Sequence, residues 1–493
     1  MACRVANKVK KTGQVFTPDY LVCQMLDYLG YVDDQVVTRH IIDNSCGDGA
    51  FLQEAVRRYA AAAIHSGLDV DVLKEHFETY IHGIDIDEEA CNACVKNLSD
   101  IALSFGVNDV CWDVRNSDAL NTLEYNGRMD FVVGNPPYVR VHNLETSYDN
   151  VKRYKFANGG MTDLYLAFFE LGFNMLADNG KLCYITPSSW LNSLAASNLR
   201  QHILLRKNLL SLVDLGHYQP FEGATAYTII SLFSKSYCED SFDYYVFDSE
   251  TYSRKFVDAL RLDEVSFDGS LFLANRETLR QLREIKQSQS IVRAKVKNGF
   301  ATLADGVFIG DQIPDSDYTI YALKASTGRW YKCLFPYDNK GKPINLSKIY
   351  ASENMRAYLE SNKTALLKGR DSSCGDWYLY GRTQALSDVY STKIAINTII
   401  KDIDSIKLNY VDKGQGVYSG LYILCDIDFD VISSILRSNE FVDYVRSLKK
   451  YKSGGYYTFS SKDLEQYLNY KLTDIYGTLA IGQRIPQCDY TLF

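Results

Sequence analysis

Short apolar runs alternate along the first half of the chain with stretches in which apolar residues recur every three or four positions. Apolar runs of this kind predict buried strands, and a recurrence near 3.6 residues predicts amphipathic helices. The predicted strands cover residues 36–43, 80–87, 110–114, 129–133, 181–186, 209–215 and 225–233. The predicted helices cover residues 18–29, 50–63, 88–103, 164–177 and 199–205. This repeated alternation predicts an α/β domain with a mixed, mostly parallel sheet.

The pattern becomes less regular beyond about residue 240. Residues 241–266 are strand-like and then charged, and residues 277–297 have helical character. A chain of 493 residues is expected to hold two or three domains. We therefore divide it into a first domain over residues 1–240, a connecting region over residues 241–290 and a C-terminal α+β domain over residues 291–493.

The composition is that of an ordinary globular protein, with 46% apolar and 23% charged residues. Twelve cysteines are scattered along the chain, and Cys91 and Cys94 form the only close pair. We expect free thiols in a reducing cytosol and no metal site. No apolar stretch approaches the roughly 20 residues of a membrane-spanning helix, and no apolar segment follows the N-terminal lysines at 8–11. We therefore expect a cytoplasmic protein.

A turn of small and polar residues, Asn44-Ser45-Cys46-Gly47-Asp48-Gly49, connects the first of these strands to a helix. Strand, glycine turn and helix in this order are typical of a nucleotide-binding βα unit. Glycine lets the backbone approach a ligand, and the helix N-terminus favours an anion. A plain βα connection would have a similar sequence. Ahead of the strand, Thr17 is expected to be a helix N-cap with Pro18 at the first helical position.

Acidic residues follow the next two predicted strands. Asp85 lies where an acid can accept hydrogen bonds from both hydroxyls of a ribose, and Asp87 is expected to cap the following helix. Alternatively, both acids cap that helix. Asp118 either accepts from an adenine amino group or is a turn residue. His82 has no metal ligands near it in sequence, so we expect it to pack in the core.

Asn135-Pro136-Pro137-Tyr138 follows the apolar strand at residues 129–133 and a glycine. The prolines lack backbone N–H groups, so they end the strand and hold the chain rigid. Asn135 and a proline carbonyl can then accept both hydrogens of one planar amino group, while Tyr138 lies flat on the ring that bears it. Such preorganised acceptors expose the nitrogen lone pair without a strong base. The plain alternative is a Pro-Pro turn with Tyr138 in the core.

The order of these blocks resembles that of the gamma-class adenine-N6 DNA methyltransferases of bacterial restriction–modification systems, the Asn-Pro-Pro-Tyr family. The resemblance covers about residues 12–235. The matching blocks are Thr12-Gly13, Thr17-Pro18, Asp43-Asn44-Ser45-Cys46-Gly47-Asp48-Gly49-Ala50-Phe51, Gly83-Ile84-Asp85-Ile86-Asp87, Ser117-Asp118-Ala119-Leu120, Asn135-Pro136-Pro137-Tyr138, Asp163-Leu164-Tyr165, Tyr184-Ile185-Thr186-Pro187 and Leu199-Arg200. Asn44 is a departure, because the family often has proline after the acid. Residues 291–493 resemble the target-recognition half of the family less specifically.

The resemblance implies a Rossmann-like catalytic domain with S-adenosyl-L-methionine as cofactor and a flipped adenine of double-stranded DNA as substrate. It assigns the cofactor to Thr17, Asp43, Cys46, Gly47, Phe51, Asp85, Ile86, Asp118, Ala119 and Asn135. Thr17 and Asp43 would hold the methionine end of the cofactor. Asp85 would bind its ribose, and Asp118 would bind its adenine amino group.

For the target base, the resemblance assigns the amino group to Asn135 and the Pro136 carbonyl, with Pro137 in the same turn. Tyr138 would stack on one face of the base and Phe221 on the other, unless Phe221 is a core residue. The implied protein is nucleoid-associated and acts in restriction–modification, with an endonuclease encoded separately, or as a solitary epigenetic enzyme. Only eleven residues precede the first block, so we expect no fused nuclease module ahead of it.

Two other classes of function stay open. Asn-Pro-Pro-Tyr also occurs in enzymes that methylate a glutamine amide of a protein, because an amide poses a similar chemical problem, and an RNA base is a further acceptor. The second class is a non-catalytic DNA-binding scaffold. The intact Asn135, Asp43 and Asp85 argue against a scaffold.

A net charge of −8 requires that any attraction to DNA come from local positive surface. Lys449, Lys450 and Lys452 form the densest late cluster, and the glycines at 454–455 are expected to end a helix beside them. We expect these lysines to contact the DNA backbone. A solvated helix face is the alternative, and the basic segment at residues 152–155 is then the next candidate.

Overall fold

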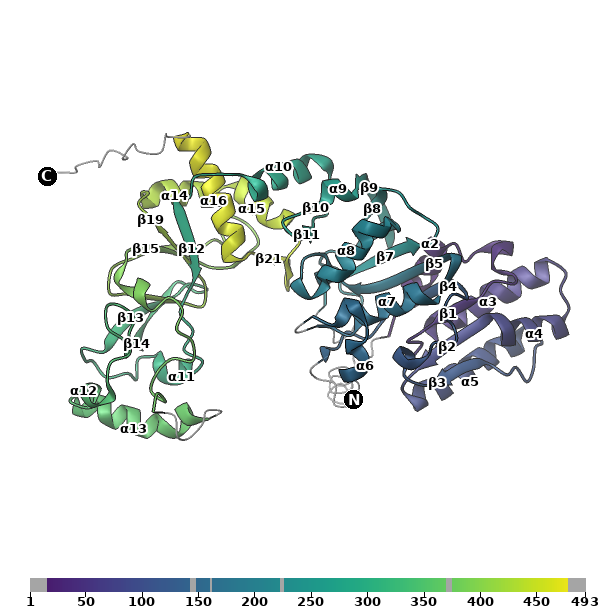
Figure 1. The fold of residues 1–493 in the computed structure, drawn as a ribbon, viewed down its shortest axis with the longest axis horizontal. Coiled ribbons are helices and arrows are strands. Elements are labelled where there is room, and N and C mark those ends of the chain that lie inside the picture. Colours follow the sequence, from purple (N-terminus) through teal and green to yellow (C-terminus); the bar gives the residue numbers. More distant parts are fainter. Residues whose placement is uncertain (1–15, 142–147, 160–161, 222–225, 369–374, 478–493) are drawn as a thin grey trace. The chain divides into compact units, whose positions relative to one another are not determined.

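The computed structural model describes residues 16–141, 148–159, 162–221, 226–368 and 375–477 (Figure 1). The chain divides into two compact units, Met1–Arg280 and Gln281–Phe493, which we describe separately. The segment predicted as the first domain, 1–240, lies in the first unit, and 291–493 lies in the second. The predicted connecting region is divided between them. Predictions that concern residues 8–13 and the start of the strand at 225 lie outside the described residues.

The first unit is built on a nine-stranded sheet with the strand order β3-β2-β1-β4-β5-β7-β6-β8-β9. Its strands are β1 (Ile41–Asp43), β2 (Ile81–Asp85), β3 (Asp113–Asn116), β4 (Met129–Gly134), β5 (Leu176–Pro187), β6 (Leu209–Asp214), β7 (Thr228–Ser234), β8 (Ser241–Asp248) and β9 (Ser253–Arg261). All pairings from β3 to β5 are parallel, as is the pairing of β6 with β8. Strand β7 is antiparallel to β5 and β6, and β9 is antiparallel to β8. The predicted mixed, mostly parallel sheet is confirmed.

Helices cover both faces of this sheet. They are α2 (Asp19–Leu29), α3 (Ala50–His65), α4 (Val70–Tyr80), α5 (Glu88–Ser104), α6 (Tyr148–Lys152), α7 (Tyr165–Met175), α8 (Ser197–Arg206) and α9 (Leu262–Val265). Val133 of β4 and Cys183 of β5 belong to the core cluster formed with α2, α3 and α5. Tyr184 of β5 lies against Gly172 of α7 on the other face. Neighbouring residues of β5 thus pack on opposite faces, as expected of a strand buried on both sides.

Three predicted strand starts in the first unit are wrong, and helices α4, α6 and α9 were not predicted. Strand β5 begins at Leu176 rather than at 181, in the segment predicted as the end of a helix. Strand β1 begins at Ile41 rather than at 36, because a 3-10 helix, Asp33–Val36, occupies the start of that segment. Strand β3 begins at Asp113 rather than at 110, and the Cys111 backbone N–H donates to the Glu78 carboxylate instead, at 2.9 Å. Helix α4 was not predicted from its few apolar positions.

The second unit is α+β over its described residues, as predicted. Its sheets have the orders β12-β19-β15-β17, β14-β13-β18 and β16-β21-β20. The strands are β12 (Ala294–Asn298), β13 (Thr319–Lys324), β14 (Arg329–Leu334), β15 (Lys393–Ile396), β16 (Ile399–Ile400), β17 (Leu408–Val411), β18 (Gly416–Tyr418), β19 (Leu421–Cys425), β20 (Tyr451–Lys452) and β21 (Tyr456–Thr458).

The longer helices of this unit are α13 (Glu353–Leu367), α14 (Phe429–Leu436), α15 (Asn439–Ser447) and α16 (Ser461–Tyr476). The shorter ones are α11 (Asp305–Phe308) and α12 (Leu346–Ile349). Helix α10 (Arg276–Gln287) crosses the boundary between the units, so the segment predicted as helical over 277–297 is a helix followed by β12.

Candidate active site

The carboxyl ends of four neighbouring parallel strands bring the predicted site residues to one edge of the sheet. Asp43 at the end of β1 pairs in register with Gly83 of β2 and Val133 of β4. Asp85 ends β2, and Asn135 follows β4 directly. The strand order reverses between β1 and β4, and ligands of open α/β sheets bind in the crevice at such a point. This edge of the sheet is therefore the candidate site.

The side chain of Asn135 is held in one orientation by the chain that precedes α2. Its Nδ2 donates a hydrogen bond of 3.2 Å to the hydroxyl of Thr17, which is itself buried. Asn135 Oδ1 is buried and has no hydrogen-bond partner among the residues that the structure describes. Thr17 is not the predicted N-cap, because α2 is capped by Pro18, which leaves the hydroxyl to accept from Asn135. The result is a fixed amide with an open acceptor.

Asp43 is buried beneath the start of the Asn-Pro-Pro-Tyr turn. A Cβ on Gly134 would lie 2.9 Å from Asp43 Oδ1, so this close approach depends on glycine. The carboxylate accepts a hydrogen bond of 3.0 Å from the Ser45 backbone N–H. Burial raises the pKa of Asp43 to about 8, hydrogen bonding to Ser45 opposes this shift, and the charge of Asp85 adds to it. A cationic group bound here would favour the ionised form of Asp43.

The glycine turn and Asp85 are joined by a hydrogen bond. The Gly47 backbone N–H donates to Asp85 Oδ2 at 2.8 Å, and the Asp87 N–H donates to Asp85 Oδ1 at 2.9 Å. Gly47 has φ +55° and Gly49 has φ +89°, values that favour glycine. Asp87 caps α5, as predicted, by accepting from the Glu89 and Ala90 N–H groups. Asp85 is thus held in place while staying only half-buried.

The remaining predicted cofactor residues divide into buried and exposed groups. Cys46, Phe51 and Ala119 are buried. Ile86 is 69% exposed beside Asp85, which offers an apolar surface to a flat ligand. Asp118 caps a short 3-10 helix by accepting from the Leu120 N–H at 3.0 Å.

Asp118 also receives a hydrogen bond of 3.1 Å from Asn150 Nδ2 of α6. Helix α6 follows the Asn-Pro-Pro-Tyr turn and ends at the first of the basic residues at 152–155. The contact between Asp118 and this segment was not predicted. Its only signal in the sequence is the cluster of polar and basic residues there.

The two aromatic residues assigned to the target base lie together. The rings of Tyr138 and Phe221 have centroids 6.1 Å apart and planes inclined at 74°, an edge-to-face contact. The Tyr138 hydroxyl donates to the Ile185 carbonyl at 3.2 Å, and burial raises the pKa of Tyr138 well above its usual value. Phe221 is 4% exposed. The structure brings the predicted pair together, but a base would stack between them only after one ring had turned.

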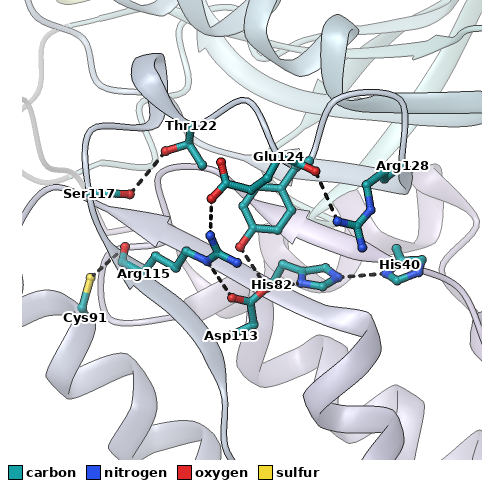
Figure 2. Close-up of polar contacts among 10 residues, drawn as sticks. His40, His82, Cys91, Asp113, Arg115, Ser117, Thr122, Glu124 and Arg128 are labelled. Carbon is teal, nitrogen blue, oxygen red and sulfur yellow. Dashed lines mark hydrogen bonds and ion pairs between the residues drawn. The ribbon is translucent and has the colours of Figure 1, made fainter.

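A second polar network lies at the opposite, amino ends of the strands (Figure 2). His82 Nδ1 is 2.7 Å from Asp113 Oδ2, and His82 Nε2 is 2.9 Å from His40 Nδ1. Asp113 also accepts from Tyr125 and Arg115 at 2.8 Å each. His82 is buried, as predicted, but it is hydrogen-bonded on both nitrogens and does more than fill space. Within the described ranges, no group of three or more His, Cys, Asp or Glu side chains could hold a metal ion.

The three lysines predicted to contact DNA have different environments. Lys450 Nζ lies 2.5 Å from Asp463 Oδ2, and the buried Lys286 bonds the other oxygen of the same carboxylate. Lys452 is exposed on β20. Lys449 is half-buried and follows the end of α15. Lys450 therefore has an internal partner, whereas Lys452 faces solvent.

The glycines beside these lysines do not end a helix, so that prediction is wrong. Helix α15 ends at Ser447, and Gly454 and Gly455 lie in the turn that connects β20 to β21, with φ values of +77° and +80°. Helical spacing of the apolar residues up to 448 does not show that the next few residues form a hairpin. The cluster is thus the base and tip of a β-hairpin.

Comparisons with known proteins agree with this arrangement. A family model described as the Eco57I restriction-modification methylase matches residues 74–221. The Type II methyltransferase M.BstVI of Geobacillus stearothermophilus is 26% identical in an alignment of 410 positions that covers 73% of this chain and 72% of that protein. The predicted resemblance to restriction–modification methyltransferases is confirmed. The similarity to methyltransferases also supports the expected cofactor, S-adenosyl-L-methionine.

Other similar methyltransferases are longer than this chain. The Type II restriction enzyme and methyltransferase RM.Eco57I of Escherichia coli is 24% identical over 478 residues, covering 76% of this chain and 48% of that protein. The chain thus spans about half the length of that relative. Among solved structures, the Type IIL restriction-modification enzyme MmeI in complex with DNA has a TM-score of 0.60 at 16% identity. That match covers 94% of this chain and 64% of MmeI and shows a shared fold. No helix among the described residues is long and apolar enough to span a bilayer.

Proposed function

We propose that this chain transfers a methyl group from S-adenosyl-L-methionine to the N6 amino group of an adenine in double-stranded DNA. The observation that carries the proposal is the Asn135 amide, which is fixed through Nδ2 by Thr17 and whose buried Oδ1 has no partner within the part of the chain that the structure describes. An unpaired buried acceptor is costly, which indicates that a donor from a ligand completes it. Both hydrogens of an exocyclic amino group are such donors.

The residues at this edge of the sheet fit the cofactor. Asp43 would accept from the amino group of the methionine part, Asp85 from the ribose hydroxyls, and Ile86 would contact the adenine. The Gly47 and Gly49 turn lets the backbone approach without a clash from side chains. S-adenosylmethionine supplies, when bound, a methyl group made electrophilic by its sulfonium centre.

In the proposed reaction, Asn135 Oδ1 and the Pro136 carbonyl accept hydrogen bonds from the adenine amino group. These bonds draw both hydrogens to one side and leave the nitrogen lone pair free on the other. Pro136 and Pro137 hold the two acceptors at a fixed separation, so no reorganisation is needed as positive charge develops on the nitrogen. As the new N–C bond replaces the sulfonium S–C bond, the amino nitrogen becomes positively charged, and it then loses one proton to solvent. The chain therefore assists by positioning and electrostatics.

DNA is the substrate that the observations favour. An adenine within a duplex hides its amino group in a base pair, so it must leave the helix to reach Asn135. Tyr138 and Phe221 are the aromatic residues beside this position, and we assign the stacking of the extruded base to them. MmeI, which shares the fold, is described in complex with DNA. A protein glutamine or an RNA base is the second candidate, because either presents a similar amino group.

The wider biological setting follows from the relatives. We assign the chain to a restriction–modification system, because the matching family model is described as a restriction-modification methylase and RM.Eco57I as a Type II restriction enzyme and methyltransferase. A cognate endonuclease encoded separately and a function as a solitary DNA methyltransferase are both compatible with this assignment. Of the three predicted lysines, we keep Lys452 as a contact with the DNA backbone because it is exposed, whereas Lys450 is bonded to Asp463.

The experiment supplies methyl-labelled S-adenosylmethionine with double-stranded DNA, RNA or a release-factor-like protein. We expect label only in the DNA, and single-molecule sequencing of that DNA should show N6-methyladenine at one recurring sequence. Label that enters RNA or protein but not DNA would favour the second candidate. A chain that binds the cofactor and labels none of the three acceptors would contradict the proposal.

A further inference from the structure

A buried hydrogen-bonded pair, Asn44 and Tyr184, lies directly behind the candidate site. Asn44 Nδ2 donates to the Tyr184 hydroxyl at 2.7 Å, and that hydroxyl donates to Asn44 Oδ1 at 3.0 Å. Asn44 is 1% exposed and Tyr184 is fully buried. Asn44 Nδ2 also lies 3.7 Å from Met175 Sδ at the end of α7. Both side chains are thus satisfied by protein groups and do not wait for a ligand.

The pair spans the strand that carries the catalytic turn. Asn44 follows Asp43 at the end of β1, and Tyr184 of β5 pairs in register with Gly134 of β4. Strand β4 lies between β1 and β5 in the sheet. The hydrogen bonds therefore connect Asn44, which follows the buried Asp43, to β5, on the other side of the strand β4 that leads into Asn135. The Asn44–Tyr184 hydrogen bonds lie where β1 and β4 stop pairing. Beyond this point, backbone hydrogen bonds no longer fix the distance between the segments that follow the two strands.

The packing around the hydroxyl is specific to tyrosine. A Cβ on Gly172 of α7 would lie 2.6 Å from the Tyr184 hydroxyl oxygen, so the helix approaches closely only because glycine is there. The Phe169 and Tyr184 rings have centroids 5.6 Å apart. Burial raises the pKa of Tyr184 well above its usual value, which keeps the hydroxyl a donor. The tyrosine is held from both sides, and it in turn holds Asn44.

We propose that Asn44 and Tyr184 are positioning residues that set the distance between Asp43 and Asn135. This inference rests on the proposed function, in which Asp43 holds the cofactor and Asn135 holds the target amino group. Proline at position 44 would stiffen the turn through its ring. Here the turn is held instead by a tertiary contact that locks the Asp43-Asn44-Ser45 backbone onto β5. The separation of methyl donor and acceptor then depends on one hydroxyl group.

The test compares Tyr184→Phe with the double variant Asn44→Leu/Tyr184→Phe. The single variant leaves the buried Asn44 amide without its partner, which lowers stability and frees the turn. The double variant removes both polar groups, so stability should largely recover. A positioning role predicts that the affinity for S-adenosylmethionine, measured by calorimetry, stays weakened about tenfold or more in both variants. It also predicts a lower kcat at saturating cofactor, because a small displacement of reacting groups costs rate steeply.

Tyr380→Phe is the matched control. It removes a buried hydroxyl that donates to the Leu334 carbonyl at 2.7 Å in the second unit. We expect it to lower thermal stability without changing cofactor affinity. Recovery of both stability and affinity in the double variant, or an unchanged affinity in Tyr184→Phe, would overturn the inference. Because the affinity is measured without DNA, it decides the inference even if the wild-type chain binds the cofactor and fails to methylate DNA.

Discussion

The amide of Asn135 donates to Thr17 through Nδ2, while its Oδ1 has no hydrogen-bond partner among the described residues. Replacing Asn135 with alanine removes this acceptor and leaves Asp43, Asp85 and the glycine turn in place. We expect Asn135→Ala to reduce methyl transfer by about 10²–10³. Cofactor affinity, measured on the same protein, should change little. Transfer at a near wild-type rate would show that the Asn-Pro-Pro-Tyr turn is not the catalytic centre.

Asp43 gives the site a pH dependence of its own. Its pKa is raised from 3.8 to about 8, so the carboxyl group holds a proton at neutral pH in the absence of a ligand. A cationic amino group bound beside it favours the carboxylate, and binding then releases that proton. Affinity for S-adenosylmethionine should therefore rise with pH, by up to about tenfold per unit, between about pH 6 and 7.5, where an α-amino group is still charged.

Asp43→Asn is the control for this dependence. The amide cannot ionise, so the variant should bind weakly and with the same affinity throughout the range. Rising pH should strengthen cofactor binding, but it should lower the stability of the protein without cofactor. Because the folded pKa of Asp43 lies above its unfolded value, its contribution to stability is present at low pH and is lost as pH rises toward 8. An affinity that falls with rising pH would contradict this account of Asp43.

At the scale of elements, two lysines of the same sequence cluster have different environments at the hairpin formed by β20 and β21. Lys452 is exposed near the turn, while Lys450 is paired with Asp463. Lys452→Gln should weaken DNA binding at every sequence and flatten the dependence of log K on log salt by about 0.9. Lys450→Gln should leave that slope unchanged. It should lower the free energy of unfolding by about 1–3 kcal/mol, because a hydrogen bond to a charged group is lost.

The salt dependence is measured by titration of labelled duplex DNA at several salt concentrations. The free energy of unfolding is measured by urea denaturation. The expectation fails if Lys450→Gln changes the salt slope as much as Lys452→Gln does, since Lys450 would then leave Asp463 for the DNA. If neither variant alters the slope, the basic segment at residues 152–155 becomes the next candidate for backbone contacts.

The elements also show why part of the site could be predicted and part could not. Asp43, Asp85 and Asn135 could be placed together because each follows an apolar run, and parallel strands end at one edge of a sheet. The contact between Thr17 and Asn135 joins residues that are 118 positions apart, and no local pattern encodes it. The same holds for Asn44 and Tyr184, which are 140 positions apart. Local propensity also made Thr17 an N-cap, although tertiary contact with Asn135 uses its hydroxyl instead.

At the scale of the whole molecule, the two units have separate cores, and the candidate site lies wholly in the first. Residues from Leu21 to Leu232 form one buried cluster, and residues from Phe300 to Tyr418 form another. Units with their own cores are expected to unfold in separate steps. Calorimetry of the full chain should therefore show two transitions. S-adenosylmethionine should move only one transition to higher temperature. At a 100-fold excess over Kd, it should raise the free energy of unfolding of that unit by about 2.7 kcal/mol.

Two variants assign the transitions to the units. Tyr380→Phe weakens the core of the second unit. It should therefore lower the temperature of only the transition that the cofactor does not shift. Tyr184→Phe weakens the first unit, so it should lower the other transition and reduce the effect of the cofactor on it. One cooperative transition that moves with both variants would mean that the units are thermodynamically one. Cofactor binding in the first unit would then stabilise the second unit as well, which is an energetic coupling between the units.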